Sequence, residues 1–279
     1  MLEGQLPIED YLLQQDLEYP AFSLQQNKLL QQFFQQGKKL RQVEPFLDVL
    51  LEIHGFFTDG NSPKDLPRPS VLFDVYSREK DATAKLIQYY IAVKSDNFSS
   101  ILESIKKFAQ ADAERFRLRD TMRAKSITSC IQKHNSIYIE AGQMHILLEK
   151  LIKQNIPKEW TMQTINIEQL LLKELGITGN VFSPGDELTA NYLLQNGLPL
   201  EHEDLLSARS LIYAKIVTKE EMTDPSSLYA HTQNEYEVIN LVNHLSIEDC
   251  EKLFFEIREL NTEAAKTHVD YFSQENQNK

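Results

Sequence analysis

Glutamates that follow short β-prone segments, together with one histidine, are the residues of this chain best suited to chemistry. Glu44 and Glu140 each end such a segment, and His145 follows Glu140 after a glycine. Glu and His side chains bind divalent metal ions, and they also act as general acids and bases. The spacing indicates either a metal site or an acid–base pair. In the alternative interpretation Glu140 caps a helix and His145 packs under a loop.

The residue pattern of 136–152 predicts the secondary structure that positions Glu140 and His145. Its residues 137–139 (Ile-Tyr-Ile) form a β-prone run, Gly142 marks a tight turn, and the apolar residues that follow recur at helical spacing. We therefore expect a strand, a turn and a helix. Ligands bind at the carboxyl ends of strands in open α/β sheets, where Glu140 would lie.

Two other segments have the same form. Residues 39–43 predict a strand that ends at Glu44 before a helix, and Leu2-Glu3-Gly4 resembles the end of a further strand. The alternating pattern of 161–167 predicts one more strand. Because the carboxyl ends of parallel strands share an edge, Glu3, Glu44 and Glu140 are expected to converge there.

Strands that alternate with helices predict an α/β fold with a small, mostly parallel sheet flanked by many helices. We expect an α/β core over residues 1–180, with a helical insertion of three helices at about 70–133. Residues 181–279 are predicted to form a helical region packed on this core, because their apolar residues fall at helical spacing.

A basic stripe lies on one predicted helix face, where Arg115, Arg119 and Arg123 are four residues apart. Arginine binds anionic groups through its fork of N–H donors, so this face would suit an anionic ligand. The alternative is a solvated face on which the arginines pair with carboxylates of the same helix. These carboxylates are Asp112, Glu114 and Asp120.

The composition of the chain restricts the classes of partner that it is expected to bind. The 279 residues include 29 basic and 41 acidic side chains, a net charge of -12 that argues against nucleic acid or an anionic membrane as a partner. No apolar run approaches the ~20 residues that span a bilayer. The first residues lack the pattern of a signal peptide, so we expect a cytoplasmic protein. Cys130 and Cys250 are expected to be buried free thiols.

Two motifs resemble a known superfamily: Arg119-Asp120-x-x-Arg123-Ala124 and Glu140-Ala-Gly142-x-x-His145. They are similar to the second half of the TraB/Tiki and ChaN-like superfamily, which includes erythromycin-esterase-like proteins. The resemblance covers about residues 1–170, and Glu44 stands where that family has a glutamate after an earlier strand. The family's first histidine motif has no counterpart in this sequence.

The resemblance implies a hydrolase-like protein that acts on a small-molecule or peptide ligand. Glu44 and His145 would bind a divalent metal ion or activate water, and Glu140 would orient His145. Metal-bound water has a pKa near ~7, which suits hydrolysis at neutral pH. Arg119, helped by Arg123 and the turn at Gly142, would hold an anionic or carbonyl group of the substrate.

The missing histidine motif favours a second hypothesis. The chain would then be a non-catalytic protein that binds haem or another small molecule, or a degenerate homologue that acts through its helical surface. The hydrolase hypothesis requires Glu44, Glu140 and His145 to lie within about 10 Å of one another in a concave pocket, with Arg119 pointing into it.

Overall fold

The computed structural model describes residues 7–131, 134–179, 181–223 and 228–277, and within these ranges it contains helices but no β-strand. The predicted α/β fold with a parallel sheet is therefore wrong. Glu3, expected at a strand end, lies outside the described residues. No helix in these ranges combines the length and apolar character needed to cross a bilayer.

The helices follow one another along the chain in the order α1 (Ile8–Leu12), α2 (Pro20–Gln35), α3 (Pro45–Thr58), the 3-10 turn η1 (Pro63–Asp65), α4 (Val71–Ala92), α5 (Phe98–Ile131), α6 (Ile146–Asn155), α7 (Ile167–Glu174), α8 (Pro184–Leu194), α9 (Leu200–Ile216), α10 (Ala230–Asn243), α11 (Ile247–Ile257) and α12 (Thr262–Gln277).

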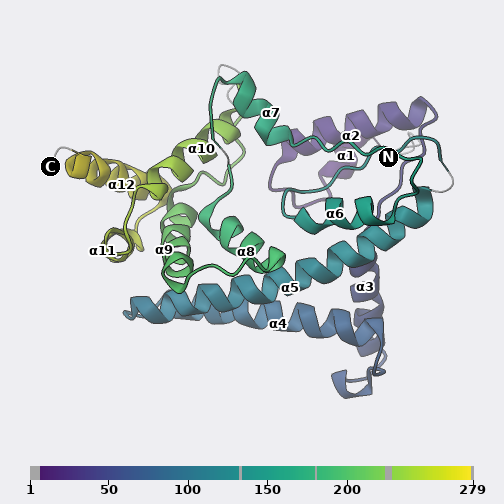
Figure 1. Cartoon of the computed structure of the whole chain (residues 1–279), viewed down its shortest axis with the longest axis horizontal. Coiled ribbons are helices and arrows are strands. Elements are labelled where there is room, and N and C mark those ends of the chain that lie inside the picture. The colour runs from purple at the N-terminus through teal and green to yellow at the C-terminus, as the bar shows by residue number, and fades with distance from the viewer. Residues whose placement is uncertain (1–6, 132–133, 180, 224–227, 278–279) are drawn as a thin grey trace.

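A long helix pair supports the rest of the structure. Helix α5 has 34 residues, about 50 Å at 1.5 Å per residue, and α4 packs along it. The predicted break near residue 110 is absent because α5 contains neither glycine nor proline, the residues least favourable inside a helix. Figure 1 shows α8 and α9 over one half of α5 and α3 and α6 at the other.

Of the helices after residue 181, α8 and α9 pack on α5, and α10, α11 and α12 pack on α9. The largest hydrophobic cluster joins the first half of α5 to α8–α12, and α9 and α11 contribute most to its centre. The residues of this cluster from α9, α10 and α11 that are almost fully buried are Leu206, Ala208, Ile212, Ile216, Val238, Val242, Cys250, Leu253 and Ile257. The predicted division of the chain into domains at residue 180 stays a prediction.

The three segments predicted as strands are irregular chain, but they do come together. Val43, Ile139 and Met162 each pack against a hydrophobic cluster formed by the end of α5 and by α6. Their alternating apolar side chains are used for packing against two helices, so the segments form no ladder of backbone hydrogen bonds. The prediction that these segments pair as strands of one sheet is therefore wrong, although all three pack against the same cluster.

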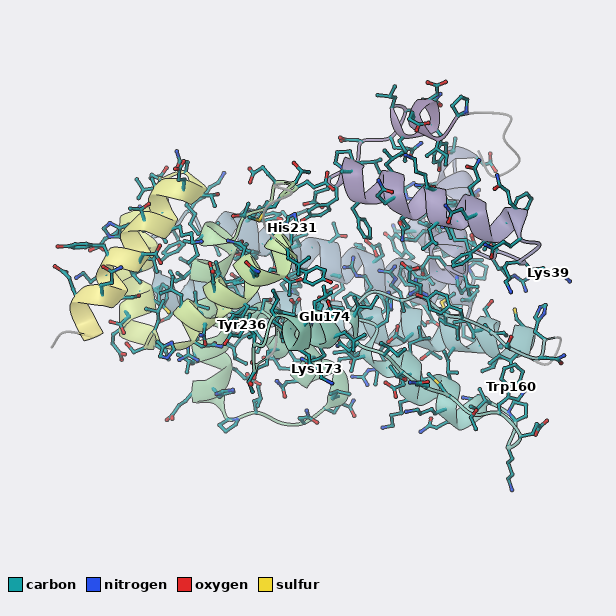
Figure 2. The ribbon with its side chains drawn as sticks, turned by 90° about the horizontal axis from the view of Figure 1, so that it is seen from above. Lys39, Trp160, Lys173, Glu174, His231 and Tyr236 are labelled. Atoms are coloured by element: carbon teal, nitrogen blue, oxygen red, sulfur yellow. The ribbon has the colours of Figure 1, made fainter. Side chains whose placement is uncertain are left out.

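Helix α2 has no fully buried residue, and polar contacts with distant segments are made in its first half. The carboxylate of Glu221 accepts hydrogen bonds from the backbone N–H groups of Ala21 (2.8 Å) and Phe22 (2.7 Å). Figure 2 shows His231 beside the start of this helix. Farther along α2, Gln26 donates to Glu140 over 2.9 Å.

The buried cluster gives a stability prediction. Leu253→Ala removes a side chain that is 0% exposed, and we expect the free energy of unfolding to fall by roughly 2–5 kcal/mol. Leu51→Ala is the control, because Leu51 is 64% exposed on α3. Urea unfolding followed by circular dichroism measures both. Equal effects of the two substitutions would show that the described core is not the stabilising one.

Candidate functional site

Two arginines of α5 converge on Glu44. Arg119 Nη2 donates to Glu44 Oε2 over 2.9 Å, and Arg123 Nη2 donates to the same oxygen. The Glu44 side chain is 12% exposed, against 26% for Arg119 and 13% for Arg123. The structure therefore brings together three of the residues that the sequence singled out.

Local sequence explains this convergence. Glu44 is the N-cap residue of α3, before Pro45, yet its side chain makes no capping hydrogen bond and pairs with α5 instead. Arg119 and Arg123 are one turn apart on α5, so both guanidinium groups project toward α3, which packs there. The Arg119 guanidinium also lies 5.7 Å from the ring of Phe46 on α3.

Several buried polar atoms of Glu44, Arg119 and Arg123 make no hydrogen bond to the described residues. Glu44 Oε1, Arg119 Nε and Arg123 Nε are buried, and none has a hydrogen-bond partner among the described residues. Burial lowers the pKa of both guanidinium groups, and the positive charge of Arg115 lowers the pKa of Arg119 further. The nearby carboxylates of Glu79, Asp120 and Asp112 act in the opposite direction and raise the pKa of Arg119.

A buried aspartate holds His145. Asp120 is 0% exposed; its Oδ1 lies 2.5 Å from His145 Nδ1, and its Oδ2 accepts the backbone N–H of Leu147 over 3.1 Å. The ring of Phe116 meets the imidazole edge-on at 5.6 Å. A carboxylate that accepts from Nδ1–H leaves Nε2 as the proton acceptor, as in the Asp–His pair of serine proteases.

The predicted turn brings His145 to this position. The backbone N–H of His145 donates to the carbonyl of Gly142 over 3.0 Å, and α6 begins at the next residue. His145 is thus the N-cap residue of α6, close to the predicted first turn. Its side chain is 10% exposed, so the imidazole lies mostly beneath the surface.

Glu140 does not take the role that the sequence assigned to it. It is exposed, and its carboxylate accepts from Gln26 of α2. The residue that orients His145 is Asp120, to which the sequence interpretation gave no role at His145. A signal was present, because Asp120 is in phase with the buried residues Ala124 and Ile127 of α5. A carboxylate on an apolar helix face needs a buried partner.

The residues do not fit the divalent metal ion expected at Glu44 and His145. Among the described residues, no group of three or more His, Cys, Asp or Glu side chains is placed to hold a metal ion. Glu44 faces two guanidinium groups, whose positive charges would repel a cation. The Nδ1 atom of His145 is already bonded to Asp120.

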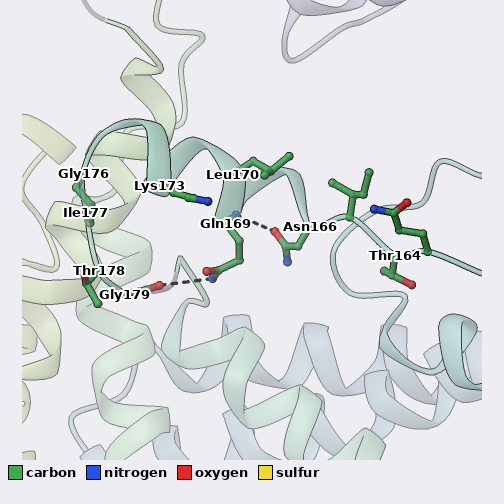
Figure 3. A pocket seen from close by; sticks show the side chains of 11 residues that line it. Thr164, Asn166, Gln169, Leu170, Lys173, Gly176, Ile177, Thr178 and Gly179 are labelled. Atoms are coloured by element: carbon green, nitrogen blue, oxygen red, sulfur yellow. Dashed lines mark hydrogen bonds between the residues drawn. The ribbon is translucent and has the colours of Figure 1, made fainter.

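An open hollow of about 760 Å³ lies elsewhere, along α7 and the segments that flank it (Figure 3). Asn166, Gln169, Lys173 and Thr178 provide its polar groups. Within it, the backbone N–H of Gln169 donates to Asn166 Oδ1 over 3.0 Å. None of the residues predicted to form the site lines this hollow, so it is not the pocket expected around Glu44 and His145.

Three carboxylates from different helices interact near α7. Burial, together with the negative charges of Glu235 and Asp186, raises the pKa of Glu168 to about 7. The pKa of Glu235 and the pKa of Asp186 are also raised, mainly by burial. The sequence interpretation did not identify this group, because no spacing pattern relates its members.

Comparison with known proteins gives one relative without a described function. The chain is 26% identical over 256 residues to an uncharacterised protein of Archaeoglobus fulgidus. The aligned region covers 91% of this chain and 84% of that protein. No known protein family matches the chain, and no solved structure matches it significantly. The similarity extends over most of both chains.

Asp120 gives the first prediction for this site. Asp120→Ala leaves His145 Nδ1 and the Leu147 N–H without their buried acceptor, and we expect a loss of roughly 2–4 kcal/mol in the free energy of unfolding. Asp81→Ala, at an exposed position of α4, should stay within about 0.5 kcal/mol of wild type. Urea titration compares them. A small effect at Asp120 would contradict the described hydrogen bonds.

The raised pKa of Glu168 gives a second prediction, which concerns the pH dependence of stability. A native-state pKa of about 7, against an ordinary value of 4.5, means that the folded protein holds this proton more tightly than the unfolded chain. The free energy of unfolding should therefore fall as the pH rises from about 4.5 to about 7. Glu168→Gln should reduce this slope and make the protein more stable than wild type at pH 8.

The matched control is Glu237→Gln, at an exposed position of α10. It should leave the pH dependence of unfolding unchanged. Urea midpoints measured at several pH values from 4.5 to 8 test both variants. An unchanged slope in Glu168→Gln would show that this carboxylate titrates as it does in water.

Proposed function

We propose that the protein is a hydrolase-like enzyme in which the Asp120–His145 pair supplies the acid–base group. The observation that carries the proposal is the hydrogen bond of 2.5 Å between His145 Nδ1 and a carboxylate that is 0% exposed. Such a carboxylate fixes the imidazole tautomer and stabilises the imidazolium that forms when Nε2 takes up a proton. The substrate is a small molecule or peptide with an anionic group.

The roles of the site residues follow from their contacts. His145 Nε2 takes a proton from water as the water attacks the scissile bond, and then returns it to the leaving group. Asp120 is a positioning residue that acts through His145. Arg119 lies on the same helix, and its guanidinium is 5.8 Å from the Phe116 ring that packs against the imidazole, so it can hold the anionic part of the substrate.

The sequence motifs support the same assignment. The resemblance of residues 119–145 to the TraB/Tiki and ChaN-like superfamily rests on Arg119, Gly142 and His145, which lie at or beside the pair. The proposal retains the hydrolytic activity that the resemblance implies. It includes neither the parallel sheet nor the divalent metal ion that were expected from the sequence. Free thiols at Cys130 and Cys250 support a cytoplasmic location, where disulfides are rare.

A second candidate function is non-catalytic. The His145 side chain is only 10% exposed, and Asp120 also accepts the N–H of Leu147 at the start of α6. In this alternative the pair fastens α6 to α5, and the protein binds a ligand or partner through other surfaces. The two candidates differ in whether His145 affects turnover or only stability.

The test uses a panel of p-nitrophenyl carboxylic and phosphoric esters with the full-length protein. Under the first proposal, His145→Ala should lower the rate of hydrolysis by on the order of 10²–10⁴, the usual contribution of a general acid–base group. Its circular dichroism spectrum should match that of wild type. His244→Ala, at an exposed position after α10, should keep the wild-type rate.

Two outcomes would favour the non-catalytic candidate. One is an absence of turnover by wild-type protein across the panel. The other is a His145→Ala variant that hydrolyses the esters at the wild-type rate but melts at a lower temperature.

A further inference from the structure

We propose that Arg119 and Arg123 form a binding site for an oxyanion, a carboxylate or phosphate group, and that the Glu44 side chain occupies this site as a displaceable plug. The inference deepens the proposed function, on which its catalytic meaning rests, by naming the class of ligand and a means of closing the site. The binding itself can be measured without any turnover.

The hydrogen-bond pattern is the first argument. Each arginine donates one hydrogen bond from Nη2 to the same oxygen, Glu44 Oε2. A guanidinium group binds an oxyanion best through two parallel N–H···O bonds, and here the buried Nε of each arginine has no partner among the described residues. A ligand with two or three free oxygens would satisfy these donors, which the single oxygen of Glu44 does not.

The Glu44 carboxylate shows the same mismatch. Its Oε1 atom is buried without a hydrogen-bond partner among the described residues, although Oε2 accepts from two arginines. A permanent ion pair in a protein interior ordinarily uses both oxygens, because an unsatisfied buried oxygen is costly. Glu44 is therefore poorly matched to the site that it fills.

Glu44 also has another favourable position. It is the N-cap residue of α3, and its side chain makes no capping hydrogen bond in the described state. The N-terminus of a helix attracts negative charge. A carboxylate displaced from the two arginines can therefore turn toward the start of its own helix, so displacement does not leave it buried without a partner.

The site has an approach from solvent and adjoins the proposed acid–base pair. Arg119 is the most exposed of the three side chains, at 26%. The centroid of the Phe116 ring lies 5.8 Å from the Arg119 guanidinium and 5.6 Å from the His145 imidazole. An oxyanion held by Arg119 and Arg123 would lie beside the pair that carries out the chemistry.

Binding of inorganic phosphate and of acetate tests this inference, measured by isothermal titration calorimetry at constant ionic strength. Glu44→Gln keeps the size of the side chain and removes its charge, and should bind the better of the two anions at least about tenfold more tightly than wild type. Adding Arg123→Lys to this variant should reverse the gain, because lysine lacks the two-donor fork. Comparing the two anions shows whether the site prefers phosphate or carboxylate.

The matched control is Glu79→Gln. Glu79 accepts from Arg115 of α5 in the same way, but Arg115 keeps a second carboxylate partner, Asp112, at 2.6 Å. This control changes the net charge by the same amount and should raise anion affinity much less than Glu44→Gln, because Glu79 acts on Arg119 only through its charge and forms its hydrogen bonds with Arg115. Equal gains in Glu44→Gln and Glu79→Gln would overturn the inference, as would no gain in Glu44→Gln.

Two further measurements keep the result decisive. If Glu44→Gln does not fold by circular dichroism, phosphate should still raise the melting temperature of wild type above that in chloride of equal ionic strength, and Arg123→Lys should remove this shift; no shift overturns the inference. Anion binding by His145→Ala should equal that of wild type. Binding without turnover would therefore count against the proposed hydrolysis alone, and turnover without binding against the plug alone.

Discussion

The unbroken helix α5 is the constraint on which the remaining structure depends. Its first half lies under the C-terminal helices, and its second half meets α3 and α6. Because a single helix carries Arg119, Asp120 and Arg123, their relative positions are set by helical geometry and not by loops. The partners of these side chains come from the segments that pack against α5. The site therefore forms where one long helix contacts several shorter segments.

Asp120 joins stability and chemistry in one side chain. It fixes the imidazole of His145 and also caps the start of α6, while being fully buried in α5. A substitution that disturbs the proposed catalytic pair therefore also loosens the attachment of a helix. This explains why rates and unfolding free energies must be measured together at this position. Glu44 is the better place to alter binding selectively, because its side chain bonds to the two arginines and caps no helix.

Helical periodicity and end signals made most of the helices predictable. A capping box at Ser246 begins α11, and Gly37 and Gly176, both at positive φ, follow the ends of α2 and α7; these residue types are typical of such positions. The strands failed because an alternation over only five or so residues fits any extended segment that packs one side of its chain, as residues 39–43 and 136–140 do against α5 and α6. In the site, the pairing of Glu44 with Arg119 was within reach of motif spacing, whereas the partner of His145 depended on knowing which face of α5 is buried.

The capping of α2 by Glu221 has a consequence for synthesis of the chain. The two residues in contact are separated by 200 positions, and α2 has no fully buried side chain of its own to hold it in place. Chains emerge from the ribosome N-terminus first, at about 5–20 residues per second. Helix α2 must therefore wait on the order of ten seconds or more for its capping carboxylate. Until Glu221 has been synthesised, the backbone N–H groups of Ala21 and Phe22 lack the carboxylate that accepts from them in the folded protein.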